Sequence, residues 1–167
     1  YPLRRQRQMC IRDRFYAHSS ALAIKSKVPS DIWKSYYKFC FDRNPFDRYI
    51  SFYNWAGGDK EYGSIKNFMD SDRGKNLLGI DLYAYNSNIL VDKVYLYESL
   101  NFAIDDLNKK FNLKNDEKIV LQKKKTKSSF RTDKRHFTEV LSSEEVEWIE
   151  KVYAREIAYF GYKFEKQ

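Results

Sequence analysis

The sequence predicts a mixed α/β fold of the nucleotide-binding kind, and two observations carry that prediction. Segments with strand character and segments with helix character follow one another along the chain, without internal repeats. In addition, an apolar strand at 36–41 leads through a tight turn into a helix at 45–55 whose start is suited to hold a phosphate group. The order of the strands in the sheet does not follow from these patterns.

The turn before the helix at 45–55 gathers hydrogen-bond donors. Asn44 is a good N-cap, and Pro45 falls at the first helical position, where its missing N–H costs nothing. At about 100° per residue, one arc of this helix roughly 100° wide is polar, and it holds Asn44, Asp47, Arg48 and Ser51. The opposite arc is apolar and holds Phe46, Tyr49, Ile50 and Tyr53. With Arg43 at the end of the strand, the polar donors are expected to converge on a dianion.

The segment from Arg43 to Tyr53 reads R-N-P-F-D-R-Y-I-S-F-Y. It resembles the 3′-phosphate-binding motif of sulfotransferases that use 3′-phosphoadenosine 5′-phosphosulfate (PAPS), most closely the family-2 and carbohydrate type. The resemblance implies that Arg43 and Ser51 hold the 3′-phosphate, with Arg48 as a weaker cofactor-binding candidate. The alternative is an amphipathic helix whose Arg and Ser are merely solvated.

The resemblance extends over about residues 15 to 164. Upstream, 18–25 reads H-S-S-A-L-A-I-K, and downstream, 89–100 is similar to a family strand that ends in Arg-x-Glu-x-Leu, with Leu96 where Arg is usual. The end of the chain, 152–164, resembles the family's closing helix and its Phe-Gly-Tyr-x-Phe segment. The resemblance implies a three-layer fold like that of the P-loop kinases, with a parallel central sheet.

The family's first strand and its phosphosulfate-binding loop have no counterpart in this sequence. Residues 1–14 hold five Arg and one Asp instead, and this segment is similar to translated sequencing-adapter read-through. A basic targeting tail is the alternative. We therefore expect a non-native or disordered tail at 1–14 and an N-terminally truncated sulfotransferase domain at 15–167.

The chemistry implied by the resemblance is transfer of a sulfuryl group from PAPS to a hydroxyl acceptor, which leaves adenosine 3′,5′-bisphosphate (PAP). The subfamily likeness favours a carbohydrate acceptor. Two residues are candidates for the base that takes the acceptor's proton: His18, at a helix start, and Glu98, at a strand end. The alternatives are a helix-entry residue for His18 and a charge at the start of the next helix for Glu98.

A late basic segment at 123–131 is a further candidate for the cofactor site. In related sulfotransferases such a loop closes over the nucleotide, and by analogy of position Lys127, Ser128 and Arg131 would touch the 3′-phosphate. The alternative is a solvated run of charge on a loop.

Composition limits the other classes of function. The net charge of +8 and pI of about 9.3 leave a nucleic-acid-binding module, or a non-catalytic remnant that binds PAP, as alternatives. Half of the excess charge lies in residues 1–14, however, and acidic residues are interleaved through most of the rest, so we expect no nucleic-acid partner.

Cys10 and Cys40 give no disulfide framework, which favours a reducing, cytoplasmic setting. No apolar run approaches the roughly 20 residues of a membrane span, no metal site is expected, and a membrane-anchored Golgi-type parent remains open.

The remaining elements follow from periodicity and capping. Helices are expected at 19–28, 64–71 and 99–111, a hairpin at 83–85 and 89–97, and a long polar loop at 114–133. The helix at 99–111 has an inner face of Leu100, Ile104, Leu107 and Phe111. The last helix begins with a capping box of Ser142 and Glu145 and ends at Gly161. Its core face consists of Val146, Ile149, Tyr153, Ile157 and Phe160.

Overall fold

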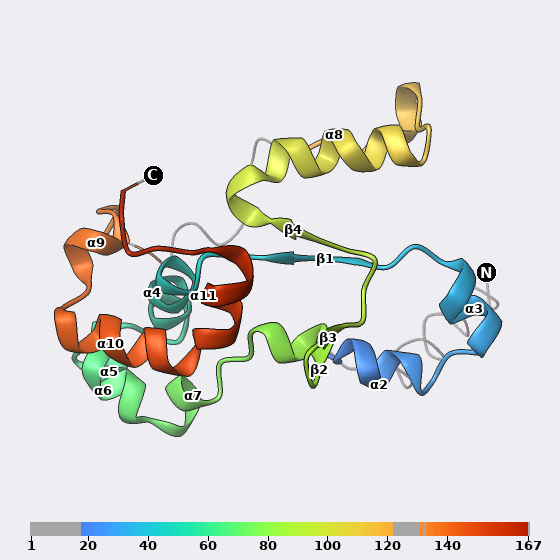
Figure 1. Cartoon of the computed structure of the whole chain (residues 1–167). Helices are drawn as coiled ribbons and strands as arrows, with labels where there is room; N and C mark the ends of the chain where they lie inside the picture. The colour runs from blue at the N-terminus through green and yellow to red at the C-terminus, as the bar shows by residue number, and fades with distance from the viewer. Residues whose placement is uncertain (1–17, 122–130, 132, 167) are drawn as a thin grey trace, which may run out of the picture. The chain divides into compact units, whose positions relative to one another are not determined.

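The computed structural model describes residues 18–121, 131 and 133–166, and these form a mixed α/β structure (Figure 1). The chain divides into two compact units. The first consists of residues up to Cys40 together with Ile80–Val94, and the second consists of Phe41–Gly79 together with the residues from Tyr95 onward. The predicted α/β class is therefore confirmed at this coarse level.

The first unit holds two short helices and a hairpin. Helix α2 (Ala21–Lys25) is capped by Ser20, whose hydroxyl accepts a hydrogen bond from the Ala23 N–H, and α3 (Ser30–Ser35) begins after Pro29. A 3₁₀ turn, η1 (Ile80–Leu82), leads into the hairpin of β2 (Ala84–Tyr85) and β3 (Asn88–Ile89). Helix α2 packs against β2.

The hairpin is shorter than the sequence predicted. Tyr85 pairs with Asn88, so only two residues form the loop, and Asn86 has a φ of 53°, a value that asparagine tolerates better than most residues. The predicted long second strand at 89–97 is wrong. Its far part is a separate strand, β4 (Lys93–Leu96), which pairs with β1 (Phe39–Asp42) in a small two-stranded parallel sheet.

Helix α4 (Pro45–Trp55) is the centre of the second unit and begins and ends where the sequence predicted. It contacts α6 (Ile65–Asp70), α9 (Phe137–Val140) and α10 (Ser143–Val152), as Figure 1 shows. The four residues predicted to form its apolar arc are all at most 4% exposed. They join a core cluster with Ala56, Phe68, Met69, Phe137, Leu141, Ile149 and Tyr153. Complete burial of one such large side chain contributes about 1.5–3 kcal/mol, so this face fixes the orientation of α4.

Further helices of the second unit follow α4 and β4. After α4 come α5 (Asp59–Tyr62), α6 and α7 (Asp72–Lys75); after β4 come η2 (Tyr97–Ser99), α8 (Leu100–Lys110) and η3 (Asn115–Glu117). Leu107 of α8 is buried as predicted, but Phe111 is 45% exposed because α8 ends at Lys110 and Phe111 lies beyond its inner face.

The predicted single closing helix is two helices, α10 and α11 (Ala154–Phe160). Its capping box of Ser142 and Glu145 and its left-handed end at Gly161, with a φ of 68°, are confirmed. The interruption is at Tyr153, whose ψ of 22° leaves the helical region and whose hydroxyl donates a hydrogen bond to the Leu77 carbonyl at 3.1 Å. This break buries Glu156, which the periodic pattern placed outside the core face.

Candidate functional site

The start of α4 is tightly held by its own cap and by a carboxylate. The Asn44 side chain accepts a hydrogen bond from the Phe46 N–H at 3.0 Å, and the Asn44 N–H donates to Glu98 Oε1 at 2.7 Å. Asn44 is only 3% exposed. Glu98 therefore lies at the first turn of α4, where a negative charge also complements the helix dipole. The sequence associated this carboxylate with proton transfer or with the helix that follows it, not with α4.

Two guanidinium groups meet at one carboxylate on the first turn of α4. Arg43 donates to Asp47 Oδ2 from Nε at 2.8 Å and from Nη2 as well, and Arg131 Nη1 donates to Asp47 Oδ1 at 2.5 Å. The three side chains are between 17% and 27% exposed, so they are accessible from solvent without being fully screened by it. The Arg43 guanidinium also lies over the Tyr97 ring, 4.9 Å from its centroid.

Arg131 is fixed by two further hydrogen bonds. Its Nε donates to the Asp133 carbonyl at 2.8 Å, and its Nη2 donates to the Arg135 carbonyl at 2.6 Å. All three of its nitrogens thus have a protein acceptor. Arg43, in contrast, uses only Nε and Nη2, and its Nη1 has no hydrogen-bond partner among the described residues. The cluster can therefore offer a free guanidinium edge to an anion.

Arg48 points toward a different set of partners from Arg43. It forms an ion pair with Glu156, its Nη1 lies 3.6 Å from Asp42 Oδ1, and its guanidinium lies 4.9 Å from the centroid of the Tyr153 ring. Burial alone lowers the pKa of Arg48, but the neighbouring Glu156 and Asp42 carboxylates outweigh that effect and raise it. With Glu156 only 1% exposed, this network joins α4 to α11 and is occupied internally.

Gly79 lies close against the Glu156 carboxylate and Arg48. A Cβ added at Gly79 would overlap the Glu156 carboxylate and would lie 3.0 Å from Arg48 Nη2. Arg48 therefore links α4 to α11 in this structure, and its role as a cofactor-binding residue stays a prediction from the motif.

The other predicted site residues have varied positions. Ser51 lies on α4, is half-buried, and its hydroxyl has no hydrogen-bond partner among the described residues. His18 is exposed, has a φ of 64° and belongs to the first unit, whereas Arg43 and Glu98 belong to the second. Lys127 and Ser128 lie outside the described residues.

Sequence reasoning missed two members of the cluster. It did not predict that Asp47 pairs with both arginines, or that the Arg43 guanidinium stacks on the Tyr97 ring. The spacing of four between Arg43 and Asp47 is a readable signal for an ion pair on a helix turn. The contact of Asp47 with Arg131 spans 84 positions and has no local signal.

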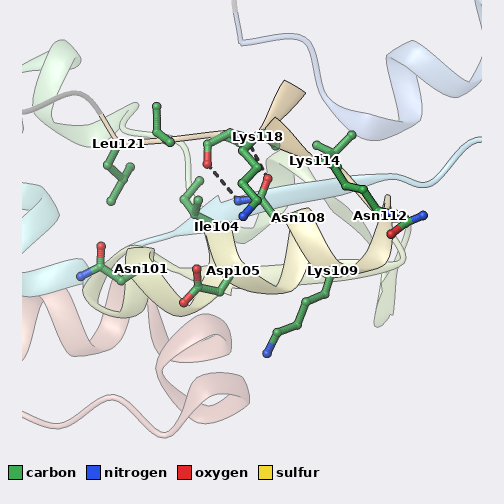
Figure 2. A pocket seen from close by; sticks show the side chains of 12 residues that line it. Asn101, Ile104, Asp105, Asn108, Lys109, Asn112, Lys114, Lys118 and Leu121 are labelled. Atoms are coloured by element: carbon green, nitrogen blue, oxygen red, sulfur yellow. Dashed lines mark hydrogen bonds between the residues drawn. The ribbon is translucent and has the colours of Figure 1, made fainter. Parts of the chain in front are cut away.

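A groove lies beside α8, with a volume of about 770 Å³ (Figure 2). On one side of the groove, the Asn108 amide forms two hydrogen bonds with the Ile119 backbone. Its Nδ2 donates to the Ile119 carbonyl at 2.9 Å, and its Oδ1 accepts from the Ile119 N–H at 2.8 Å. The groove is open, with Asn101, Asp105, Lys109 and Lys118 along it. Its side chains diverge in Figure 2 and do not converge on one point, so it does not define a binding site.

Two structural findings concern other classes of site. Within the described residues, no three His, Cys, Asp or Glu side chains lie close enough together to hold a metal ion. Nor does that part of the chain contain a helix of sufficient length and apolar character to cross a membrane.

Comparison with known proteins gives one informative match. No protein-family model matches the chain, and no solved structure does. An uncharacterized protein of Archaeoglobus fulgidus is 30% identical over 98 residues, which cover 56% of this chain and 82% of the archaeal protein. The two chains belong to one family.

Proposed function

We propose that this protein binds the 3′-phosphate of PAPS and of its product PAP at the first turn of α4, as part of a sulfotransferase. The observation that carries the proposal is the meeting of Arg43 and Arg131 at Asp47, because it brings together two cations that the family resemblance associates with the same phosphate. The finer fold proposed with it is the three-layer P-loop-kinase-like one.

The residues present fit a phosphate ligand. Arg43, just before α4, keeps its Nη1 edge for charge-assisted hydrogen bonds, and Ser51 adds a hydroxyl donor from α4. Lys127 and Ser128 remain candidates on the basis of the sequence alone. PAPS would supply the sulfuryl group that passes to a hydroxyl acceptor, for which a carbohydrate is favoured by the subfamily likeness.

The proton of the acceptor hydroxyl needs a base. Glu98 is exposed and lies next to the start of α4, where one of its oxygens already accepts the Asn44 N–H. Its other oxygen is the proposed proton acceptor. His18 remains the second candidate, since an imidazole accepts a proton near neutral pH.

Calorimetric titration of the protein with PAP tests the proposal. We expect saturable binding, and Arg43→Ala should weaken it by about 10- to 150-fold, because a hydrogen bond to a charged group contributes roughly 1.5–3 kcal/mol. Arg73→Ala is the matched control. It also removes one cation from the second unit, but the Arg73 guanidinium lies over the Phe52 and Trp55 rings and not at the Asp47 cluster. Absence of PAP binding by the unmodified protein would overturn the proposal.

The same variants separate this function from nucleic-acid binding. Binding to a nucleic-acid polymer would depend steeply on salt and would change little in Arg43→Ala, because it depends on many phosphate contacts. A polymer that binds tightly while PAP does not would favour that class of function.

A further inference from the structure

The carboxylate of Asp47 connects the two arginines of the phosphate cluster. It accepts from Arg43 on Oδ2 and from Arg131 on Oδ1, so each oxygen serves one guanidinium. Arg131 is in turn anchored by the Asp133 and Arg135 carbonyls. Arg43 is therefore connected through Asp47 and Arg131 to the Asp133 and Arg135 carbonyls.

This arrangement limits the freedom of Arg43. An isolated arginine side chain has many rotamers and must lose them when it binds a ligand. Here the Nε and Nη2 edge is held by Asp47 and one face lies on the Tyr97 ring, so the remaining Nη1 edge has a defined direction before a ligand arrives. Ordering a side chain in advance reduces the free-energy cost of binding.

The charge of the cluster also has a consequence. Two guanidinium groups and one carboxylate by themselves leave one net positive charge, so the three side chains attract anions, although the Asp47 charge weakens that attraction for every anion. A phosphate with three oxygens satisfies the free donors better than a less charged group does.

We propose that Asp47 is the positioning residue that gives the cluster its selectivity for a nucleotide with a 3′-phosphate. The inference rests on the proposed function, because it assigns the free Arg43 edge to that phosphate. It adds a residue that acts through Arg43 and does not itself touch the ligand.

The test compares PAP with adenosine 5′-monophosphate, which lacks the 3′-phosphate. Asp47→Asn should weaken PAP binding about ten-fold and leave binding of the monophosphate unchanged, because only the 3′-phosphate depends on the direction of Arg43. Asp47→Glu, which keeps the charge, should restore part of the selectivity. Glu144→Gln is the control for net charge, since Glu144 forms an exposed pair with Lys66.

Each outcome has a distinct meaning. Equal losses for both nucleotides would show a general effect on folding and would overturn the inference, as would an Asp47→Asn variant that binds PAP as well as or better than the unmodified protein. In those cases the proposed function survives if Arg43→Ala still removes PAP binding. If the unmodified protein does not bind PAP, the proposed function and the inference both fail.

Discussion

The guanidinium of Arg48 and the carboxylate of Glu156 form a buried ion pair that joins the polar arc of α4 to α11. Glu156 is 1% exposed, and Asp42 lies 3.6 Å from Arg48 Nη1, which places two acidic groups near one cation. Removing one partner of such a pair strongly destabilises the fold, because the remaining charge stays buried without compensation.

Arg48→Ala should therefore lower the free energy of unfolding by about 3–5 kcal/mol. Urea denaturation followed by circular dichroism measures this change. Glu144→Gln removes one partner of an exposed pair, which solvent screens, and should change the same quantity far less than Arg48→Ala does. An Arg48→Ala protein as stable as the unmodified chain would show that the network contributes nothing to the fold.

Two buried tyrosines provide a matched test of hydrogen bonding in the core. Tyr49 is fully buried, and its hydroxyl has no hydrogen-bond partner among the described residues, whereas the Tyr153 hydroxyl donates to the Leu77 carbonyl. Tyr49→Phe should leave the free energy of unfolding unchanged or raise it by about 1 kcal/mol, because it removes an unsatisfied polar group. Tyr153→Phe should lower it by about 1 kcal/mol, because the Leu77 carbonyl loses its donor. Thermal and urea denaturation of both variants check this, and a loss of stability in Tyr49→Phe would mean that its hydroxyl has a partner in solution.

Local sequence signals predicted α4 to the residue. The cap at Asn44, the proline at the first helical position and the apolar arc all act within one helix, so they can be read from neighbouring residues. The capping box at Ser142 and the glycine at 161 were predicted for the same reason.

Elements that depend on distant partners were not predicted. The 89–97 segment has strand character throughout, but its pattern does not say that its far part pairs with β1 instead of continuing the hairpin. Likewise, the apolar period of the last helix continues through Tyr153, and the break there depends on Leu77 and Arg48, which are distant in sequence. In the site, Arg43 was identified from its motif, but its connection to Arg131 through Asp47 exists only in the folded chain.

Alkaline pH should destabilise the second unit through its buried tyrosines. Burial raises the pKa of Tyr153 to about 12, with the nearby Arg48 opposing and Glu156 adding to this effect. Burial, followed by the Asp42 carboxylate, also raises the pKa of Tyr162, whose hydroxyl donates to Asp42 at 3.2 Å. An unfolded tyrosine has a pKa of about 10, so between pH 10 and 12 the unfolded chain releases a proton that the folded chain retains.

The free energy of unfolding therefore falls as the pH rises, because the unfolded chain binds fewer protons than the folded chain in this range. The stabilisation is complete below pH 10 and is lost as the pH rises through about 12, by up to about 1.4 kcal/mol per pH unit for each tyrosine. Urea denaturation at pH 9, 10 and 11 measures the slope, and Tyr153→Phe should make it shallower. A free energy of unfolding that is constant over this range would contradict the prediction.

The segment at 119–121 should be released by a single change in α8. Two hydrogen bonds from the Asn108 amide hold the Ile119 backbone, although Val120 and Leu121 are exposed (Figure 2). Each bond contributes about 1 kcal/mol, so Asn108→Ala, which removes both, should increase the population of the open segment and accelerate tryptic cleavage after Lys118 by about 30-fold. Asn101→Ala changes the same residue type on the same helix, about two turns before Asn108, and serves as the control. Mass spectrometry of the fragments over time gives both rates, and equal rates for the two variants would mean that the Asn108 amide does not hold the segment in solution.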